Sequence, residues 1–330
     1  MVLITGGTGH LGNVLVRKLI ESGERVRILV HPTDNLVSLQ LLPVEIFYGD
    51  VRNDFSYALN GIDAIFHLAS LIAITPTKRK LLYSVNVDGT KNIIEHAKSK
   101  SIPLIYVSSV HAFAEIEKGS TITEETPVDE DRVIDDYAKS KALATKLVES
   151  SFKDGLDGFI VFPTGIFGPY DYKDSYFSRV MKKYRGGKLK YTVRGSFDFV
   201  DVRDVANSIV KLYKSLKSGK ISKERYIVSG HDIRFEELPA LCGAREFKVL
   251  DDTTADILSY VSLIANVILK IPAEFVPYAL HTIRLNYKFS NEKLKSTIPY
   301  SLIKVEDSVH DFFNWLNELN KHGRMCYNII

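Results

Sequence analysis

The chain has 330 residues, of which 45% are hydrophobic and 25% charged, a globular composition long enough for one large or two smaller domains. Lys and Arg number 43 against 40 Asp and Glu, a balance that does not favour a nucleic-acid binder. The two cysteines form no closely spaced pair, no signal segment opens the chain, and the most membrane-like stretch, 257–269, is too short to span a bilayer. We therefore expect a cytoplasmic protein without a membrane span or a metal site.

Short apolar runs alternate with amphipathic segments through the first half of the chain. Runs rich in Val, Ile, Phe and Tyr predict strands at 2–5, 26–30, 44–49, 63–69, 103–109 and 158–163. Helices are predicted at 10–22, 78–99 and 137–152, with shorter ones near 35–41 and 54–60. Continuous apolar runs are typical of parallel strands covered on both faces. The alternation predicts the α/β class, with a Rossmann-like, doubly wound parallel sheet.

The first helix is preceded by a glycine-rich turn, TGGTGHLG, at residues 5–12. Gly6, Gly9 and Gly12 follow a strand and open a helix. Glycines at these places allow a tight turn and let the backbone approach a pyrophosphate, which lies on the free N–H groups of the helix. The strand–turn–helix context makes the motif a strong prediction of a dinucleotide site.

The end of the second predicted strand bears on which dinucleotide binds. An NAD site usually has Asp or Glu there for the ribose 2′-hydroxyl, about 20 residues past the glycines. Here His31 occupies the place, Asp34 comes three residues later, and Arg25 and Arg27 are near in sequence. The missing carboxylate removes repulsion against a 2′-phosphate. The sequence favours NADP, with NAD possible.

The motif YAKSK at 137–141 places Tyr137 and Lys141 one helical turn apart, on the same face. A nearby ammonium that lowers the tyrosine pKa from ~10 toward ~7 would make the phenol a general acid/base at neutral pH. Ser108 and Ser109 end the strand before this helix, at the edge where ligands bind in such sheets. We expect one of these serines to hold a substrate carbonyl.

After Pro163 the pattern becomes less regular. Strands are predicted at 198–202 and 224–230 around a helix at 203–217, followed by a mainly helical tail with a strand near 286–290. We expect an NAD(P)-binding domain at 1–164, to which 198–230 returns. A smaller, mainly helical substrate-binding region would cover 165–330. The stretch 257–269 carries a narrow polar stripe and could pack in the core, cover a pocket, join a dimer or rest on a membrane surface.

Together these motifs resemble the extended short-chain dehydrogenase/reductase family over nearly the whole chain. TGGTGHLG is similar to the family's glycine pattern. The other matching segments, in the family's order, are GD at 49–50, HLAS at 67–70, NVDGT at 86–90, YVSS at 106–109, YAKSK and PTGIFGP at 163–169. FVDVRDVANSIV at 199–210 resembles the dihydroflavonol-reductase and 3β-hydroxysteroid-dehydrogenase branch.

The resemblance implies roles for the matching residues. Tyr137 would donate or accept the proton, Lys141 would hold the nicotinamide ribose and lower the Tyr137 pKa, and Ser109 would orient the carbonyl. Lys139 and Ser140 would lie off this face, on the surface or at an interface. The cofactor would contact Gly6, Gly9, His10, Leu11, Gly12, His31, Asp50, Val51, Ala69, Pro163, Thr164 and Ile166, besides Tyr137 and Lys141. The resemblance also implies a homodimer through helices near 85–98 and 137–152.

Departures from the family patterns narrow the expected substrate. Sugar-nucleotide epimerases of this family carry a diphosphate-binding Arg where this chain has Phe197, although Arg194 could substitute. The expected pocket wall is apolar and aromatic: Ile72, Ile74, Phe113, Phe167, Tyr170, Tyr172, Tyr176 and Phe177. We expect an NADP-preferring reductase or dehydrogenase of an apolar or phenolic carbonyl compound. The alternatives are an NAD-dependent sugar-nucleotide epimerase and a non-enzymatic redox sensor.

Overall fold

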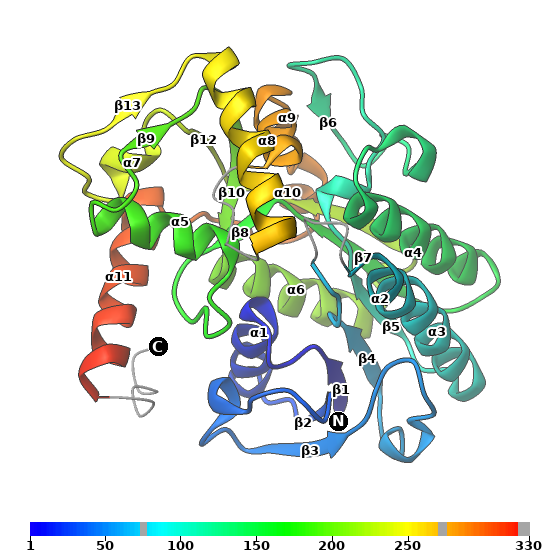
Figure 1. The fold of residues 1–330 in the computed structure, drawn as a ribbon. Helices are drawn as coiled ribbons and strands as arrows, with labels where there is room; N and C mark the ends of the chain where they lie inside the picture. The colour runs from blue at the N-terminus through cyan, green and yellow to red at the C-terminus, as the bar shows by residue number, and fades with distance from the viewer. Residues whose placement is uncertain (73–77, 270–275, 323–330) are drawn as a thin grey trace.

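A seven-stranded parallel sheet forms the centre of the protein (Figure 1), seen in a computed structural model that describes residues 1–72, 78–269 and 276–322. The strands follow the order β11-β7-β5-β4-β1-β2-β3. Their bounds are β1 Val2–Thr5, β2 Val26–Val30, β3 Val44–Tyr48, β4 Ala64–His67, β5 Leu104–Val107, β7 Gly158–Pro163 and β11 Glu224–Val228. The order reverses at β1, next to β4, and ligands bind at such a switch point in doubly wound sheets.

Helices cover both faces of this sheet, as its continuous apolar strands require. On one face lie α1 (His10–Glu21) and α6 (Val202–Lys217), which pack on each other. On the other lie α3 (Gly89–Lys100) and α4 (Asp136–Lys153), which are also neighbours. The chain enters α3 through α2 (Arg79–Tyr83) and a π-helical turn. The predicted Rossmann-like fold is confirmed.

A second region lies beyond the carboxyl edge of the sheet and holds three small sheets. Strands β8 (Gly165–Phe167), β10 (Ser196–Asp201) and β12 (His231–Arg234) form one of them. The other two pair β9 (Tyr191–Thr192) with β13 (Lys248–Val249), and β6 (Thr121–Ile122) with β14 (Lys288–Phe289). Its helices are α5 (Tyr176–Arg185), α7 (Leu238–Leu241), α8 (Asp252–Leu269), α9 (Pro277–Arg284), α10 (Glu292–Thr297) and α11 (Val305–His322).

The segment that was expected to return to the first domain divides between the two regions. Strand β11 extends the main sheet beside β7, and α6 covers that sheet beside α1. Strand β10, by contrast, pairs with β8 and β12 in the smaller sheet. The chain therefore crosses between the regions at Asp201, whose side chain caps the start of α6.

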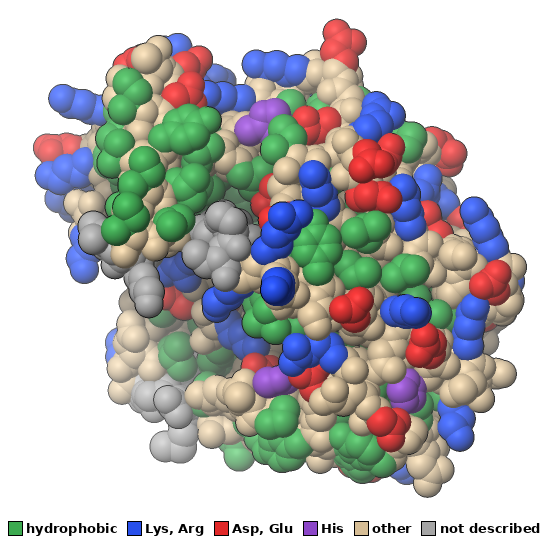
Figure 2. Space-filling view, turned by 45° about the vertical axis from the view of Figure 1, so that its right-hand side comes forward, with side chains coloured by type: hydrophobic (Ala, Val, Ile, Leu, Met, Phe, Trp, Pro, Cys, Tyr) green, Lys and Arg blue, Asp and Glu red, His purple; other side chains and the backbone are tan. Residues whose placement is uncertain are grey.

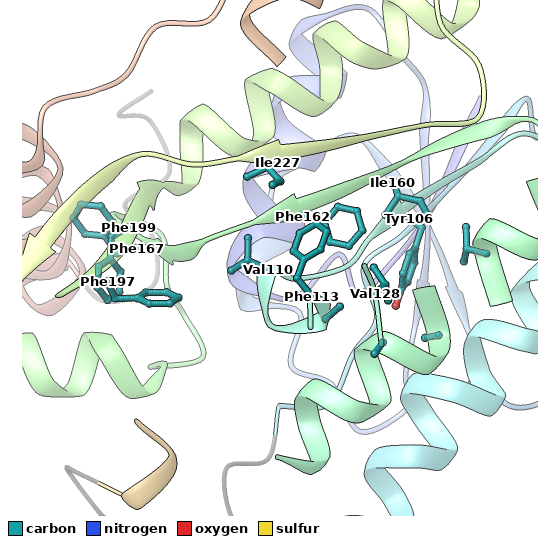
Figure 3. Packing of buried hydrophobic residues seen from close by; sticks show 14 of the residues in the cluster. Tyr106, Val110, Phe113, Val128, Ile160, Phe162, Phe167, Phe197, Phe199 and Ile227 are labelled. Atoms are coloured by element: carbon teal, nitrogen blue, oxygen red, sulfur yellow. The ribbon is translucent and has the colours of Figure 1, made fainter. Parts of the chain in front are cut away.

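Aromatic residues of one hydrophobic cluster lie in both regions (Figure 3). Phe113 lies against Phe162 of β7, with ring centroids 4.6 Å apart. Farther along the same core, Phe167 and Phe177 pack on Phe199 of β10. Burial of such side chains stabilises the fold by ~2–3 kcal/mol each. The core is thus continuous beneath the edge where the predicted site residues lie.

Candidate active site

The glycine-rich turn joins β1 to α1 at the switch point of the sheet. Gly6 has a φ of +74°, and a Cβ atom there would lie 2.6 Å from the Ala69 nitrogen. A Cβ atom on Gly12 would lie 2.1 Å from the Gly6 carbonyl oxygen. Only glycine therefore fits at either place, and the turn packs directly on the segment after β4. Ala69 lies beside the turn, where the resemblance implies cofactor contact.

The amino end of α1 is suited to an anion. Gly9 is its N-cap, its first turn carries no acidic residue, and among the described residues no side chain caps it. Exposed first-turn N–H groups and the helix dipole attract phosphate groups. The loop after β8 lies against this end, where His10 Nε2 is 2.9 Å from the Pro169 carbonyl oxygen and Asn13 donates to that of Tyr170.

At the carboxyl end of β2, His31 and Arg52 share one carboxylate. Arg52 donates from Nε and Nη2 to Asp50, and His31 Nε2 lies 3.4 Å from Asp50 Oδ2. Hydrogen bonding by Arg52 lowers the pKa of Asp50 to about 2, so this carboxyl stays ionised. The Arg52 guanidinium and the His31 imidazole therefore lie where the adenosine ribose would bind.

Arg25 and Arg27, which are near His31 in sequence, lie away from this place. Both belong to the amino end of β2. The Arg27 guanidinium is nearly buried there, bonded to Glu45 and to the carbonyl oxygens of Ala58 and Asn60. Arg25 is exposed and lies 3.9 Å from Glu45. Residues close in sequence can still be separated by the length of a strand. Arg25 and Arg27 lie at the amino end of β2, whereas the dinucleotide would bind at its carboxyl end.

Asp34 belongs to a second polar group beside the turn. It accepts a hydrogen bond from the Thr8 hydroxyl at 2.5 Å and pairs with Lys173 at 3.3 Å. Thr8 and Lys173 also border a hollow of about 280 Å³. Lys173 comes from the loop before α5, so this ion pair links the two regions across the dinucleotide edge.

The predicted catalytic residues come together where the carboxyl end of β5 meets the start of α4. Ser109 follows β5, and Asp135 caps α4 by accepting from the Ala138 N–H at 2.8 Å, which fixes where Tyr137 begins the helix. Tyr137 and Ser109 are within hydrogen-bonding reach. Lys141 Nζ donates to the Val107 carbonyl oxygen at 2.8 Å and lies 4.7 Å from the Tyr106 ring centroid.

The electrostatics of this pair differ from the expectation. Burial raises the pKa of Tyr137 to about 12, against a lowering contribution from Ser109, with Asp135 adding to the rise. Burial also lowers the pKa of Lys141 to about 7, because its ammonium has little contact with water. The expected lowering of the Tyr137 pKa by Lys141 is therefore absent from the described site, where desolvation outweighs attraction.

Ser140, expected on the surface or at an interface, is fully buried within the chain. Its hydroxyl donates to the Tyr137 carbonyl oxygen and accepts from Asn86 at 2.9 Å. The Asn86 side-chain amide also accepts a hydrogen bond from the Leu71 N–H and donates one to the Leu71 carbonyl oxygen. This network ties α4 to the chain that leaves β4, so it holds Tyr137 in place relative to the dinucleotide turn.

A narrow cavity is bordered by Ala138 and by His111, whose ring centroid lies 6.2 Å from that of Tyr137. It has about 40 Å³ of free volume, enough for only a few water molecules. Its walls include Val110, His111, Phe113, Ala138, Phe197 and Tyr278. The His111 ring stacks on Phe197 and its Nδ1 lies 2.9 Å from the Tyr278 hydroxyl. Burial lowers the pKa of His111 to about 4, so its imidazole is neutral at pH 7.

The predicted substrate residues scatter. Phe113 lines this cavity. Phe167 is buried and packs against Phe177, so its place in a substrate pocket stays a prediction. Tyr170 lies toward α1 and Trp315, with its backbone carbonyl on Asn13. Ile72 is exposed, and Ile74 lies outside the described residues.

The residues expected beside the carboxamide follow β7. Pro163 ends that strand, and Thr164 is buried with its hydroxyl donating to Asp198 at 2.6 Å. Ile166 is half-buried in β8, paired with Val200 of β10. Thr164 therefore joins the two sheets. Pro163 and Ile166 lie at the carboxyl edge of the main sheet, as does the glycine-rich turn.

Comparison with known proteins places the chain among relatives. The model of the 3-beta hydroxysteroid dehydrogenase/isomerase family matches residues 3–232. The sterol demethylase protein B of Methylococcus capsulatus is 33% identical over 231 residues, 69% of each chain. The chain belongs to this family. The family resemblance predicted from the sequence motifs is confirmed. The protein is an enzyme of the dehydrogenase/reductase type.

Other members of the family and its fold are also similar. A putative dihydroflavonol 4-reductase of Synechocystis is 30% identical, covering 72% of this chain and 70% of its own. The crystal structure of gox2253 has a TM-score of 0.82 at 29% identity over 98% of this chain and 99% of its own. A Bacillus cereus UDP-glucuronic acid 4-epimerase in complex with NAD has a TM-score of 0.73 at 18% identity, over 97% of this chain and 99% of its own, which shows the fold alone.

Sequence reasoning missed Arg52, Lys173, Asp135 and Tyr278. Arg52 comes directly after Asp50 and Val51, which the family resemblance already marked as cofactor contacts, so its position could have been noticed in the sequence. Asp135 stands two residues before the tyrosine, where N-caps are common. Tyr278 meets His111 across 167 positions, and Lys173 meets Asp34 across 139. No local pattern could reveal those two pairs.

Proposed function

We propose that the protein is an NADP-preferring reductase or dehydrogenase that acts on the carbonyl or alcohol group of an apolar small molecule. The observation that carries the proposal is the convergence of Ser109, Tyr137 and Lys141 at the edge that also holds the glycine turn. The epimerase alternative is less well supported, because buried Phe197 stacks on His111 where an anion-binding arginine would be expected.

A nicotinamide dinucleotide fits the residues at this edge. The cradle between Gly6 and Gly12 leaves no room for a side chain, and the amino end of α1 offers N–H groups for the pyrophosphate. His31 and Arg52 would meet the adenosine end, and Lys141 the nicotinamide ribose. Solved relatives of the same fold are complexes with NAD. The Arg52 guanidinium near the end of β2 favours the extra phosphate of NADP.

The side chains of this site would bind and protonate a carbonyl oxygen. Ser109 donates a hydrogen bond that fixes the oxygen, and Tyr137 transfers its phenolic proton to it. Because the pKa of Tyr137 is about 12, the phenol is protonated at neutral pH and serves as the acid in the direction of reduction. When bound, the cofactor supplies or accepts the hydride.

The cavity favours an apolar substrate. Its walls are mainly aliphatic and aromatic, and the neutral His111 can hydrogen-bond an oxygen without requiring a charge. Human sterol-4-alpha-carboxylate 3-dehydrogenase, decarboxylating, is 28% identical over 284 residues, and the Synechocystis relative is described as acting on a dihydroflavonol. We infer a polycyclic or phenolic carbonyl compound. The small free volume implies that the walls move when it enters.

The test is a panel of sterol, flavonoid and simple ketones and alcohols, followed at the nicotinamide absorbance with each cofactor. Tyr137→Phe should lower kcat by about a hundredfold or more, since the proton donor is lost while the ring and its packing stay. Ser109→Ala should cost a similar or smaller factor.

Two controls separate chemistry from folding. Tyr83→Phe removes a hydroxyl of α2 that donates a hydrogen bond to Asp136, a neighbour of Tyr137 on α4. This variant should keep turnover within about twofold of wild type. Retention of near-normal turnover by Tyr137→Phe would contradict the mechanism. Purification with tightly retained cofactor and turnover of a nucleotide sugar without added cofactor would support the epimerase instead.

A further inference from the structure

Helix α8 exposes most of its large apolar side chains to solvent, while several of its polar side chains lie toward the protein. Ser259 is fully buried and Ala255 nearly so, while Ser262 and Asn266 are half-buried on the same side. The outward side carries Ile257, Leu258, Tyr260, Val261, Ile264, Val267 and Ile268, exposed by 39% to 70%. This is the reverse of an ordinary surface helix.

The exposed face is large and continuous. Figure 2 shows it as a hydrophobic patch at the upper left of the molecule. Seven such side chains expose on the order of 600 Å² of apolar surface, the upper end of what single proteins leave uncovered. From Ile257 to Leu269 the sequence contains no charged residue. We propose that this face of α8 docks on the surface of a phospholipid bilayer.

The chemistry of the face favours lipid over a second protein surface. Protein interfaces combine an apolar centre with a polar rim and about one hydrogen bond per 100–200 Å². On this face only Tyr260 offers a polar atom. A second copy would need about 800 Å² from each partner for a stable dimer, which this single helix does not provide. Hydrocarbon requires neither polar rim nor shape match.

A polar hollow beside the face suits phospholipid headgroups. It measures about 440 Å³ and lies between Tyr260 of α8 and residues of α9. Arg284 and His281 line it, each paired with a carboxylate, Asp256 and Glu115 respectively. Lys118 also lines it, is exposed, and has no ion pair within the described part of the chain. A cation next to an apolar face is the arrangement that binds interfacial phosphates.

Docking would also place the candidate active site near the bilayer. Helix α9 packs against α8 and contributes Tyr278 to the cavity beside Tyr137. If the substrate is apolar, as the proposed function has it, it would be concentrated in the lipid that α8 contacts. Among the described residues no helix is long and apolar enough to cross a membrane, so the contact would be with one surface only.

The test uses the full chain and phosphatidylcholine vesicles, without any substrate. Wild type should float with the vesicles at both low and ~0.5 M salt, because the face is uncharged. The triple variant Val261→Ser, Ile264→Ser, Ile268→Ser should bind at least tenfold more weakly. The control Leu41→Ser, Leu81→Ser removes exposed leucines elsewhere and should float like wild type.

A second variant reports the contact directly. Tyr260→Trp places an indole on the face, and the chain's one tryptophan, Trp315, is buried. Its emission should shift to the blue when vesicles are added. Absence of flotation and of this shift would overturn the proposal. It would equally be overturned if light scattering showed a wild-type dimer that the triple variant breaks, which would assign α8 to a second copy.

Discussion

Asp50 lies at the adenosine end of the site, where Arg52 and His31 share it, and this group bears on the proposed choice of cofactor. The pKa of Asp50, lowered to about 2 by Arg52, keeps that carboxylate paired at every working pH. His31 shares it at 3.4 Å. A 2′-phosphate at this end would meet the Arg52 guanidinium beside Asp50, although the first strand-end position carries no arginine. The proposed preference for NADP depends on Arg52 more than on His31.

Arg52→Gln tests that dependence. We expect NADPH to bind about tenfold more weakly, since a charge-assisted hydrogen bond to phosphate is lost, while NADH changes by less than about threefold. Fluorescence titration of both dinucleotides measures the two affinities. Arg25→Gln makes the same charge change at the other end of β2 and should affect neither. Equal weakening of NADH and NADPH would show that Arg52 supports the adenosine pocket generally.

At the scale of elements, the turn between β1 and α1 depends on close packing of a helix against its own turn. The hypothetical Cβ of Gly12 meets the Gly6 carbonyl at 2.1 Å and Gly7 Cα at 2.9 Å, both backbone atoms that cannot rotate away. Gly12→Ala must therefore separate α1 from the turn. The amino end of α1 would then no longer face the pyrophosphate.

We expect Gly12→Ala to weaken dinucleotide binding by at least tenfold and to lower the Tm by several degrees. Gly61→Asn is the control, because Gly61 also has a positive φ but nothing lies within 4 Å of its Cβ position. Calorimetry with NADPH measures binding, and a thermal melt measures folding. Wild-type affinity in Gly12→Ala would mean that the turn tolerates a wider helix spacing.

The elements that the sequence predicted well are those with strong local patterns. The six apolar runs of the first half became β1 to β5 and β7, and Tyr137 and Lys141 fell on α4. In the smaller sheets, β10 and β14 overlap the predicted strands at 198–202 and 286–290. The remaining strands there have two to four residues and no alternation long enough to detect. Phe167 was assigned to the pocket because apolar residues suit both pocket and core, and only its contacts with Phe177 and Phe199 distinguish the two. The reversed burial on α8 was equally hidden, since periodicity shows two faces but not which one is covered.

At the scale of the whole molecule, the candidate site is kept at a cost to stability. Lys141 is 3% exposed, and burial lowers its pKa from 10.5 to about 7. Between those pH values the unfolded chain binds a proton that the folded chain does not. The free energy of unfolding contributed by this lysine therefore rises with pH across that window, and the burial penalty is complete below about pH 7.

Lys141→Met removes the charge and keeps a side chain of similar length. At pH 6.5 the cofactor-free variant should melt about 3 °C above wild type, because relief of the burial penalty exceeds the loss of the hydrogen bond to the Val107 carbonyl. The difference should shrink steadily as the pH rises toward 10.5, and turnover should be lost at every pH. Melting curves from pH 6 to 10 give the comparison. Lys139→Met, on the same helix but off the Tyr137 face, should show no such dependence on pH. A variant that melts below wild type at pH 6.5 would mean that Lys141 stabilises the fold in its charged form, and that its environment is better hydrated than its burial implies.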